Sequence, residues 1–169
     1  MKNNKATYLD KNLSRINKAL LNSIPEENYS EITKAIHYSV MNGGKRIRPQ
    51  LMLLIAEALE VDVDDKTIDL MAAAGELIHC YSLIHDDLPA MDDDDFRRGK
   101  LSCHKKFSEA TAILAGDAIQ PLSLEILTSI NDKNLSAESK CQIINIFAKA
   151  CGPKGMVEGQ NLDIKAENK

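Results

Sequence analysis

HDDLPAMDDDDFRRGK, residues 85–100, is the stretch around which the rest of the chain is organised. Six of its first eleven residues are aspartates, and a basic cluster containing Arg97 and Arg98 follows at once. Carboxylates this close repel one another and destabilise the fold unless a cation lies among them. Mg²⁺ suits hard carboxylate oxygens and is usually held by one or two carboxylates plus substrate phosphates. The arginines would face those phosphates, so the stretch predicts a site for a metal-bridged diphosphate.

The alternative is a solvated acidic loop, but the position of Asp86 and Asp87 directly after an apolar helix argues against it. Pro89 cannot continue that helix, because its ring clashes with the carbonyl four residues earlier. The aspartates therefore lie near a helix C-terminus, where the helix dipole disfavours anions and a cation is again favoured. Asp86 and Asp92 are six apart and off-phase on a regular helix, so a kink or bulge is needed to bring both to one metal.

Composition and length indicate one globular domain over residues 1–169. A formal charge of −4 argues against wholesale nucleic-acid binding, so we expect no nucleic-acid partner. We expect no membrane span, because no apolar run reaches about 18 residues without charge, and no signal peptide, because the N-terminus leads into no apolar segment. The cysteines lack CxxC and zinc-ligand spacing, so we expect reduced, structural thiols and a cytoplasmic protein: Cys80, Cys103, Cys141 and Cys151.

Apolar residues recur with a helical period along the whole chain, and no alternating strand pattern is present. Prolines, glycines and capping serines mark the helix ends. The sequence therefore predicts an all-α fold of about seven helices: 8–24, from Glu26 to the stop at Gly43, from Pro49 through Leu59, 68–87, from an N-cap at Ser108 through Ile130, from an N-cap at Ser136 to Gly152, and one that begins near Gly155.

The helix predicted over residues 68–87 is apolar almost all round and should be buried on most sides. Gly75, His79, Ser82 and Asp86 are spaced so that they face one way, and a polar stripe on a central helix suggests the wall of a cleft. Taken alone, His79 is either a core histidine with satisfied hydrogen bonds or a functional residue. Its place on the stripe of Asp86 favours function.

A second basic segment, GGKRIRP, covers residues 43–49. A glycine turn, a helix N-terminus and three cations together favour anion binding: Lys45, Arg46 and Arg48. A Walker motif is excluded, because Ser39 stands where it needs glycine and Arg46 where it needs Ser or Thr. A basic loop on a solvated surface remains the alternative.

Two features of the helix after Ser108 carry structural expectations. Asp117 lies among small and apolar residues, so we expect its carboxylate to be buried and hydrogen-bonded. Pro121 lies within the helix and should kink it.

Three motifs occur in order, at residues 43–49, 79–99 and 159–163 (GQNLD), and a fourth match covers TAILAGDA at 111–118. Together they resemble the trans-isoprenyl diphosphate synthase family, and within it the bacterial farnesyl diphosphate synthases, which share the DDxxxxD form of the first aspartate-rich motif. The resemblance covers nearly the whole chain. It implies an isoprenoid-synthase-type helical bundle and a Mg²⁺-dependent prenyltransferase that acts on isoprenyl diphosphates, and the family is usually homodimeric.

The resemblance also implies residue roles. Asp86 and Asp92 would act through the Mg²⁺ ions that they bind, with Asp87 nearby, and Arg97 would contact the allylic diphosphate. Gln160 and Asp163 would lie near the reacting carbons and the metals. Four residues would hold isopentenyl diphosphate: Lys45, Arg48, His79 and Arg98.

The residue types suit the family's chemistry. Metal ions and arginines stabilise the diphosphate that leaves an allylic substrate, and the cation left behind is attacked by isopentenyl diphosphate before a proton is lost. Tyr81 lies about 7 Å below the metal site at 1.5 Å rise per residue. It is either ordinary core or the floor of the product-tail pocket, and in the family an aromatic there accompanies a short, farnesyl-length product.

The sequence after Asp95 shows neither the Lys-Thr pair nor the second aspartate-rich motif that the family carries downstream. We therefore expect the N-terminal portion of a truncated bundle, as a fragment of an active farnesyl diphosphate synthase, a broken gene or a subunit completed by another chain. The alternatives are a non-catalytic partner subunit, a geranylgeranyl diphosphate synthase, and a Mg²⁺-dependent diphosphate hydrolase, for which no water-activating group stands out.

Overall fold

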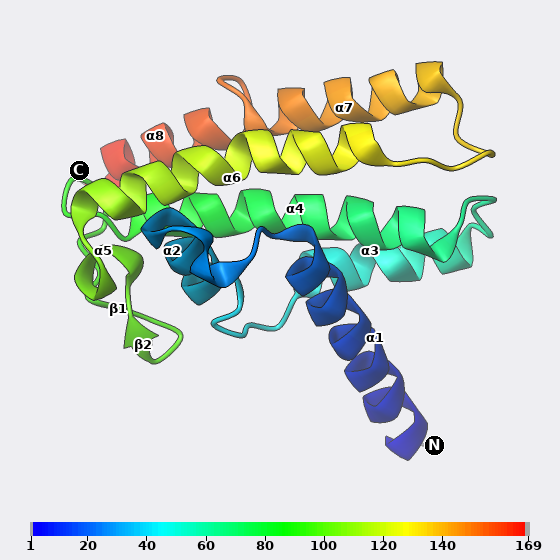
Figure 1. Cartoon of the computed structure of the whole chain (residues 1–169), viewed down its shortest axis with the longest axis horizontal. Coiled ribbons are helices and arrows are strands. Elements are labelled where there is room, and N and C mark those ends of the chain that lie inside the picture. The colour runs from blue at the N-terminus through cyan, green and yellow to red at the C-terminus, as the bar shows by residue number, and fades with distance from the viewer. Residues whose placement is uncertain (1, 168–169) are drawn as a thin grey trace. The chain divides into compact units, whose positions relative to one another are not determined.

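The computed structural model describes the backbone of residues 2–167 and the side chains of residues 8–166. Most of these residues are helical (Figure 1). The elements are α1 Lys2–Ser23, the 3₁₀ helix η1 Glu27–Tyr29, α2 Glu31–Val40, α3 Ile47–Ala58, α4 Asp65–Asp86, β1 Phe96–Arg97, β2 Lys100–Leu101, α5 Cys103–Lys106, α6 Glu109–Ser129, α7 Ala137–Cys151 and α8 Met156–Glu167.

The chain forms two compact units, residues 1–132 with α1 to α6 and residues 133–169 with α7 and α8. The all-α class is confirmed, and α5 is a four-residue helix beyond those predicted. The single domain expected over residues 1–169 stays a prediction.

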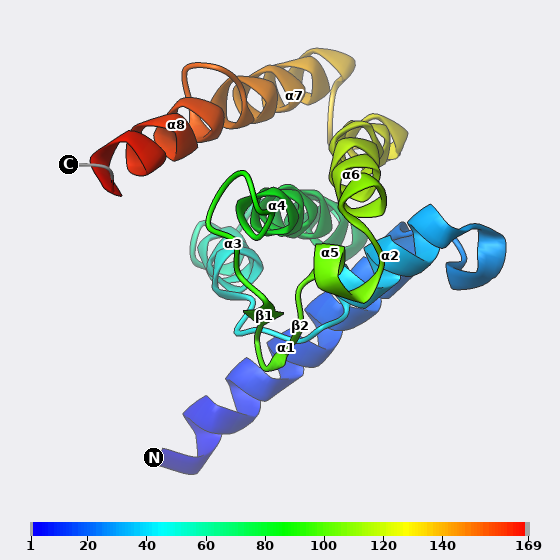
Figure 2. The same cartoon turned by 90° about the vertical axis from the view of Figure 1, so that its left-hand side faces the viewer.

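Helix α4 is the centre of the first unit. It contacts α1, α2, α3 and α6, and Figure 2 shows it end-on with α1, α3 and α6 around it. Leu77 and Ala73 are fully buried in this core. The prediction of a helix buried on most sides is therefore confirmed, and the site at its C-terminus is built on the most constrained element of this unit.

The start of α4 is set by a residue far along the chain. The helix begins at Asp65, three residues before the predicted Ile68. Asp132 is buried, and its Oδ2 accepts hydrogen bonds from the Asp64 backbone N–H and the Thr67 hydroxyl, both at 2.7 Å. This carboxylate binds polar groups at the start of the helix, where the N-cap residue Asp64 makes no side-chain capping hydrogen bond.

The capping serines define three other helix starts. Ser108 Oγ accepts from the Thr111 N–H at 3.0 Å, and Ser136 Oγ accepts from the Ser139 N–H at 3.0 Å, as predicted. The second helix begins later than the predicted Glu26, because Ser30 and Thr33 form a reciprocal capping box that fixes its start at residue 31.

Arg46 and Glu76 form a buried ion pair between the basic loop and α4. Arg46 Nη1 lies 2.8 Å from Glu76 Oε1, and both side chains are about 2% exposed or less. Arg46 also donates to the Val40 carbonyl at 2.6 Å and to Asn17 Oδ1 at 3.2 Å. The loop is thereby tied to α1, α2 and α4 at one point.

Residues 96–101 form a hairpin that the sequence pattern did not predict. β1 and β2 pair antiparallel, with Arg97 opposite Lys100. Arg98 and Gly99 both have positive φ, at 55° and 79°, as a two-residue hairpin turn requires. Strands of two residues are too short to show an alternating pattern in the sequence.

Helix α6 is long and apolar enough to cross a membrane by length and composition alone. Its inward side is buried in the first unit through Ala112, Ala115 and Ile119. A core helix has the same composition, so this helix gives only weak evidence of a membrane span. Pro121 lies inside α6, and the predicted kink stays a prediction.

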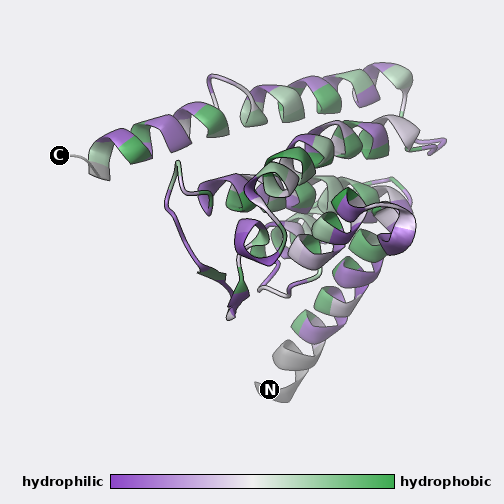
Figure 3. Cartoon of the chain, turned by 60° about the vertical axis from the view of Figure 1, so that its left-hand side comes forward, coloured by the Kyte–Doolittle hydropathy of each residue, from purple (hydrophilic) through white to green (hydrophobic). Residues whose placement is uncertain are grey.

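The second unit consists of α7 and α8, joined by a turn at Gly152–Gly155. The predicted stop at Gly152 and restart near Gly155 are confirmed. Figure 3 shows hydrophobic and hydrophilic residues side by side along both helices.

Replacing Glu76 with Gln should strongly destabilise the fold, because it leaves the Arg46 guanidinium buried without its counter-charge. We expect the free energy of unfolding in urea to fall by roughly 3–5 kcal/mol. Glu125→Gln, at an exposed position of α6, is the matched control and should change it by less than about 0.5 kcal/mol. Equal losses for the two variants would contradict a structural role for the buried pair.

Candidate active site

The turn that follows α4 brings Asp86 and Asp92 together through their backbones. The Asp92 N–H donates to the Asp86 carbonyl at 2.8 Å, and the Met91 and Asp93 N–H groups both donate to the Leu88 carbonyl. The chain therefore folds back on itself at Pro89, as the off-phase spacing required. Asp86 is partly exposed and Asp92 is exposed, and both lie at the negative end of the helix dipole.

Asp87 differs from its neighbours because Arg97 holds it. It is 2% exposed, and the Arg97 Nε donates to its Oδ1 at 2.9 Å. Burial raises the pKa of the Asp87 carboxyl, and the Arg97 guanidinium partly offsets this. A second partner of Arg97 is Asp94 Oδ2 at 3.2 Å, which sequence reasoning missed because nothing distinguishes Asp94 within a run of four aspartates.

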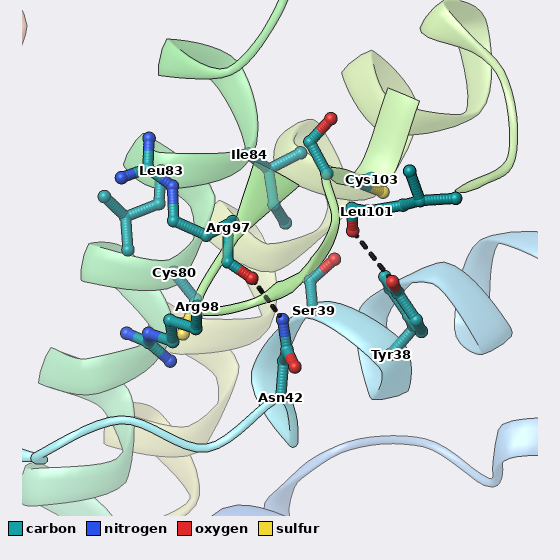
Figure 4. A pocket seen from close by; sticks show the side chains of 11 residues that line it. Tyr38, Ser39, Asn42, Cys80, Leu83, Ile84, Arg97, Arg98, Leu101 and Cys103 are labelled. Atoms are coloured by element: carbon teal, nitrogen blue, oxygen red, sulfur yellow. Dashed lines mark hydrogen bonds between the residues drawn. The ribbon is translucent and has the colours of Figure 1, made fainter. Parts of the chain in front are cut away.

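The hairpin that carries Arg97 and Arg98 is fixed to the end of α2. Asn42 Nδ2 donates to the Arg97 carbonyl at 3.1 Å, and the Tyr38 hydroxyl donates to the Leu101 carbonyl at 2.8 Å, as Figure 4 shows. The same figure shows that these residues line a small pocket with Cys80 and Ile84 of α4. The two arginines are therefore held at defined positions rather than on a free loop.

Arg98 extends to the basic loop, where its Nη1 donates to the Gly43 carbonyl. A Cβ on Gly44 would lie 2.6 Å from the Arg98 Cζ, so glycine at residue 44, where φ is +118°, leaves the room that the guanidinium needs. The glycines of GGKRIRP thus serve to seat an arginine from the hairpin.

The predicted isopentenyl-binding residues are only partly brought together. Burial lowers the pKa of His79, and the positive charges of Arg48 and Arg98 lower it further, while the Glu76 carboxylate opposes them. We refer to Arg48, His79 and Arg98 as the basic cluster. Lys45 and Arg48 are exposed on either side of the buried Arg46. The expectation that Lys45, Arg46 and Arg48 all serve one anion site was wrong for Arg46, whose guanidinium is turned to Glu76.

Asp117 is not the buried carboxylate that its small neighbours suggested. Its side chain is 57% exposed, with Oδ1 3.9 Å from His85 Nε2. The glycine at residue 116 instead leaves room for the His85 ring, because a Cβ on Gly116 would lie 2.2 Å from His85 Nε2. His85 is also 3.1 Å from the Ile113 carbonyl and packs edge-on against the ring of Tyr81, which is 4% exposed.

Three further side chains converge beside the aspartate-rich turn. One ligand atom each of Asp93, Asp95 and His104 lie within 4.8 Å of one another, so the group could hold a cation. Sequence reasoning missed it, because a single histidine nine residues beyond an aspartate run matches no known ligand spacing.

Gln160 and Asp163 lie on α8 of the second unit, three residues apart and therefore on neighbouring positions of one helix face. Their predicted roles, and those of the other predicted site residues, stay predictions.

The helical fold, the aspartate-rich turn and the basic loop together point to one protein family. Residues 29–169 match the sequence model of the family described as Polyprenyl synthetase, so the chain belongs to that family. Among curated relatives, it is 49% identical over 144 residues to the farnesyl diphosphate synthase of Haemophilus influenzae, covering 85% of this chain and 48% of the relative. It is 47% identical over 146 residues to that of Escherichia coli, with coverages of 86% and 48%.

Solved structures agree. A geranyltransferase from Legionella pneumophila matches with a TM-score of 0.90 at 45% identity, over 97% of this chain and 57% of that one. An FPP/GFPP synthase from Zymomonas mobilis matches with a TM-score of 0.85 at 37% identity, over 100% and 60%. The predicted isoprenoid-synthase-type fold is confirmed, and the chain spans about half the length of the curated relatives it matches.

His79 provides a test of the basic cluster. Because the folded chain binds its proton less tightly than the unfolded chain, acidification through the ordinary histidine range should lower the free energy of unfolding. Arg48→Gln should raise the pKa of His79 towards its ordinary value, measured by NMR titration of the ring, whereas Lys18→Gln on α1 should leave it unchanged. An unchanged midpoint in Arg48→Gln would show that Arg48 does not act on His79.

Proposed function

We propose that this chain supplies the diphosphate-binding part of a prenyltransferase that condenses isopentenyl diphosphate with an allylic diphosphate to give farnesyl diphosphate. The observation that carries the proposal is the paired arrangement at the end of α4. One hairpin links an acidic cluster of Asp86, Asp87 and Asp92 to the basic loop. Its Arg97 donates to Asp87, and its Arg98 donates to the Gly43 carbonyl of the loop that carries Lys45 and Arg48. The farnesyl diphosphate synthases among the relatives support it.

The residues at the acidic cluster fit Mg²⁺. The backbone hydrogen bond between Asp86 and Asp92 brings two aspartates into one turn. Hard oxygen donors of this kind would leave coordination positions on Mg²⁺ for waters and phosphate oxygens. Asp86 and Asp92 would hold the ion, while Asp87 is engaged with Arg97 and acts by positioning that arginine. The bound Mg²⁺ would supply positive charge to a departing diphosphate.

The rest of the mechanism is electrostatic. Arg97 would face the allylic diphosphate from the acidic side, and Lys45, Arg48, His79 and Arg98 would hold the diphosphate of isopentenyl diphosphate. Because the pKa of His79 is lowered, its ring would be neutral at neutral pH and would donate a hydrogen bond rather than a charge. Fixed donors of this kind stabilise charge where it develops, without reorganising.

The proposal also includes a homodimer, a cytoplasmic location and isoprenyl diphosphates as the small-molecule partners.

The decisive experiment is a product assay with isopentenyl and geranyl diphosphates and Mg²⁺. It uses the chain alone and the chain grafted in place of the matching segment of the Haemophilus influenzae farnesyl diphosphate synthase. A C15 diphosphate supports the synthase, and a longer product points to a geranylgeranyl-type enzyme. Free phosphate would indicate a hydrolase, and no turnover with either protein would favour a non-catalytic partner.

Asp92→Asn in the grafted enzyme should lower kcat by about 10²-fold or more, because it removes a ligand that acts on the leaving diphosphate. Asp10→Asn removes an exposed aspartate of α1 and is the matched control, which should leave kcat unchanged. A kcat for Asp92→Asn equal to that of the control, at saturating Mg²⁺, would remove Asp92 from the metal site.

Tyr81→Ala in the grafted enzyme should lengthen the products. Tyr81 is buried one and a half turns before Asp86, and the smaller side chain would open the floor beneath the growing tail. Chromatography of the dephosphorylated products measures this, with Tyr81→Phe as the control that keeps the ring. Unchanged product length in Tyr81→Ala would show that Tyr81 is an ordinary core residue and does not limit product length.

A further inference from the structure

We propose that Asp93, Asp95 and His104 form a second divalent-cation site, separate from Asp86 and Asp92, that ties the aspartate-rich turn to α5. One carboxylate oxygen from each aspartate and one imidazole nitrogen lie within 4.8 Å of one another. Ligand atoms about 2.1 Å from one ion lie roughly 3 to 4 Å apart, so only a small contraction closes the site. None of the three is a residue to which the family resemblance assigns a role.

An orphaned nitrogen of His104 provides independent evidence for a ligand. The side chain is 94% buried, since its exposed fraction is 6%, and its Nε2 has no hydrogen-bond partner among the described residues. A buried polar atom without a partner costs free energy and calls for an explanation. A bound cation would supply the missing partner.

The other ring nitrogen has the partner that a metal-binding histidine usually has. His104 Nδ1 is 3.1 Å from Ser102 Oγ, and this hydroxyl is buried with it. If Nδ1–H donates to Ser102, the Nε2 lone pair is left to bind a metal, and the ring orientation is fixed. Ser102 is itself held in place, because its backbone N–H donates to the Asp95 carbonyl at 2.9 Å.

The backbone also fixes the two aspartates. Asp93 has a positive φ of 52° and donates its N–H to the Leu88 carbonyl at 3.1 Å. Asp95 lies directly before β1, and His104 lies in α5 directly after β2. A cation here would therefore clamp both ends of the hairpin that carries Arg97 and Arg98.

Lys105 shows that this site already attracts positive charge. Its Nζ lies 2.8 Å from Asp95 Oδ1, with the two side chains 40% and 60% exposed. An exposed ion pair is weak and easily displaced, so a divalent ion that also binds Asp93 and His104 would replace it.

The ligand set indicates the kind of ion. Mg²⁺ prefers oxygen ligands and waters, whereas an imidazole nitrogen with two carboxylates suits Zn²⁺, Mn²⁺ or Co²⁺. The two sites would thus differ in metal preference, with oxygen donors alone at Asp86 and Asp92.

The test is a Zn²⁺ titration of the ¹⁵N-labelled chain, followed through the histidine ring nitrogens by NMR. We expect one equivalent of Zn²⁺ to shift the His104 resonances, while Mg²⁺ leaves them in place. Asp93→Asn should weaken the binding at least tenfold and keep the fold, because asparagine tolerates the left-handed backbone of residue 93. Asp86→Asn/Asp92→Asn and His37→Gln are the controls, and both should keep the affinity.

Lys105→Gln should strengthen binding several-fold, because it removes the competitor for Asp95, and an unchanged affinity would exclude Asp95 as a ligand. His104 resonances that do not move at millimolar Zn²⁺ would overturn the proposal. So would an affinity that survives Asp93→Asn or that disappears in the Asp86→Asn/Asp92→Asn variant.

Discussion

The buried ion pair between Arg46 and Glu76 is the constraint on which the site depends. Arg46 is in the left-handed backbone region, with φ of 48°, and its guanidinium binds Glu76, the Val40 carbonyl and Asn17. A buried ion pair needs further hydrogen-bond partners such as these, because the cost of removing both charges from water otherwise outweighs their attraction. Since Arg46 is turned inward, its neighbours Lys45 and Arg48 are left at the surface, where they can meet an anion.

The second constraint is that α4 must end where Pro89 forces it to. Asp86 is the last residue of the helix. The turn that follows is closed by one backbone hydrogen bond, from the Asp92 N–H to the Asp86 carbonyl. The hairpin that follows sends two consecutive arginines to different partners, Arg97 to Asp87 and Arg98 to the Gly43 carbonyl. One hairpin therefore contacts both the aspartate-rich turn and the basic loop.

The long helices and several of their ends could be predicted from the sequence, because local sequence patterns determine them. Periodic apolar residues predicted the long helices, and Ser108, Ser136 and Gly152 predicted their ends through capping chemistry. Three of the failures involve contacts between distant segments. The start of α4 depends on Asp132, the inward turn of Arg46 depends on Glu76, and the exposure of Asp117 depends on the ring of His85 against Gly116. No single-segment pattern carries that information, and a hairpin with two-residue strands lies below the length at which alternation can be recognised.

The charge balance of the aspartate-rich turn links its structure to binding. Six carboxylates lie within residues 86–95. Arg97 pairs with Asp87 and Asp94, and Lys105 pairs with Asp95. Six carboxylates this close together at the negative end of a helix repel one another unless positive charge lies among them. Any cation that binds the folded turn better than the unfolded chain must therefore stabilise this turn by mass action. Because Arg97 donates to Asp87 and Asp94 of the same turn, metal binding to the turn and the stability of the hairpin would be coupled.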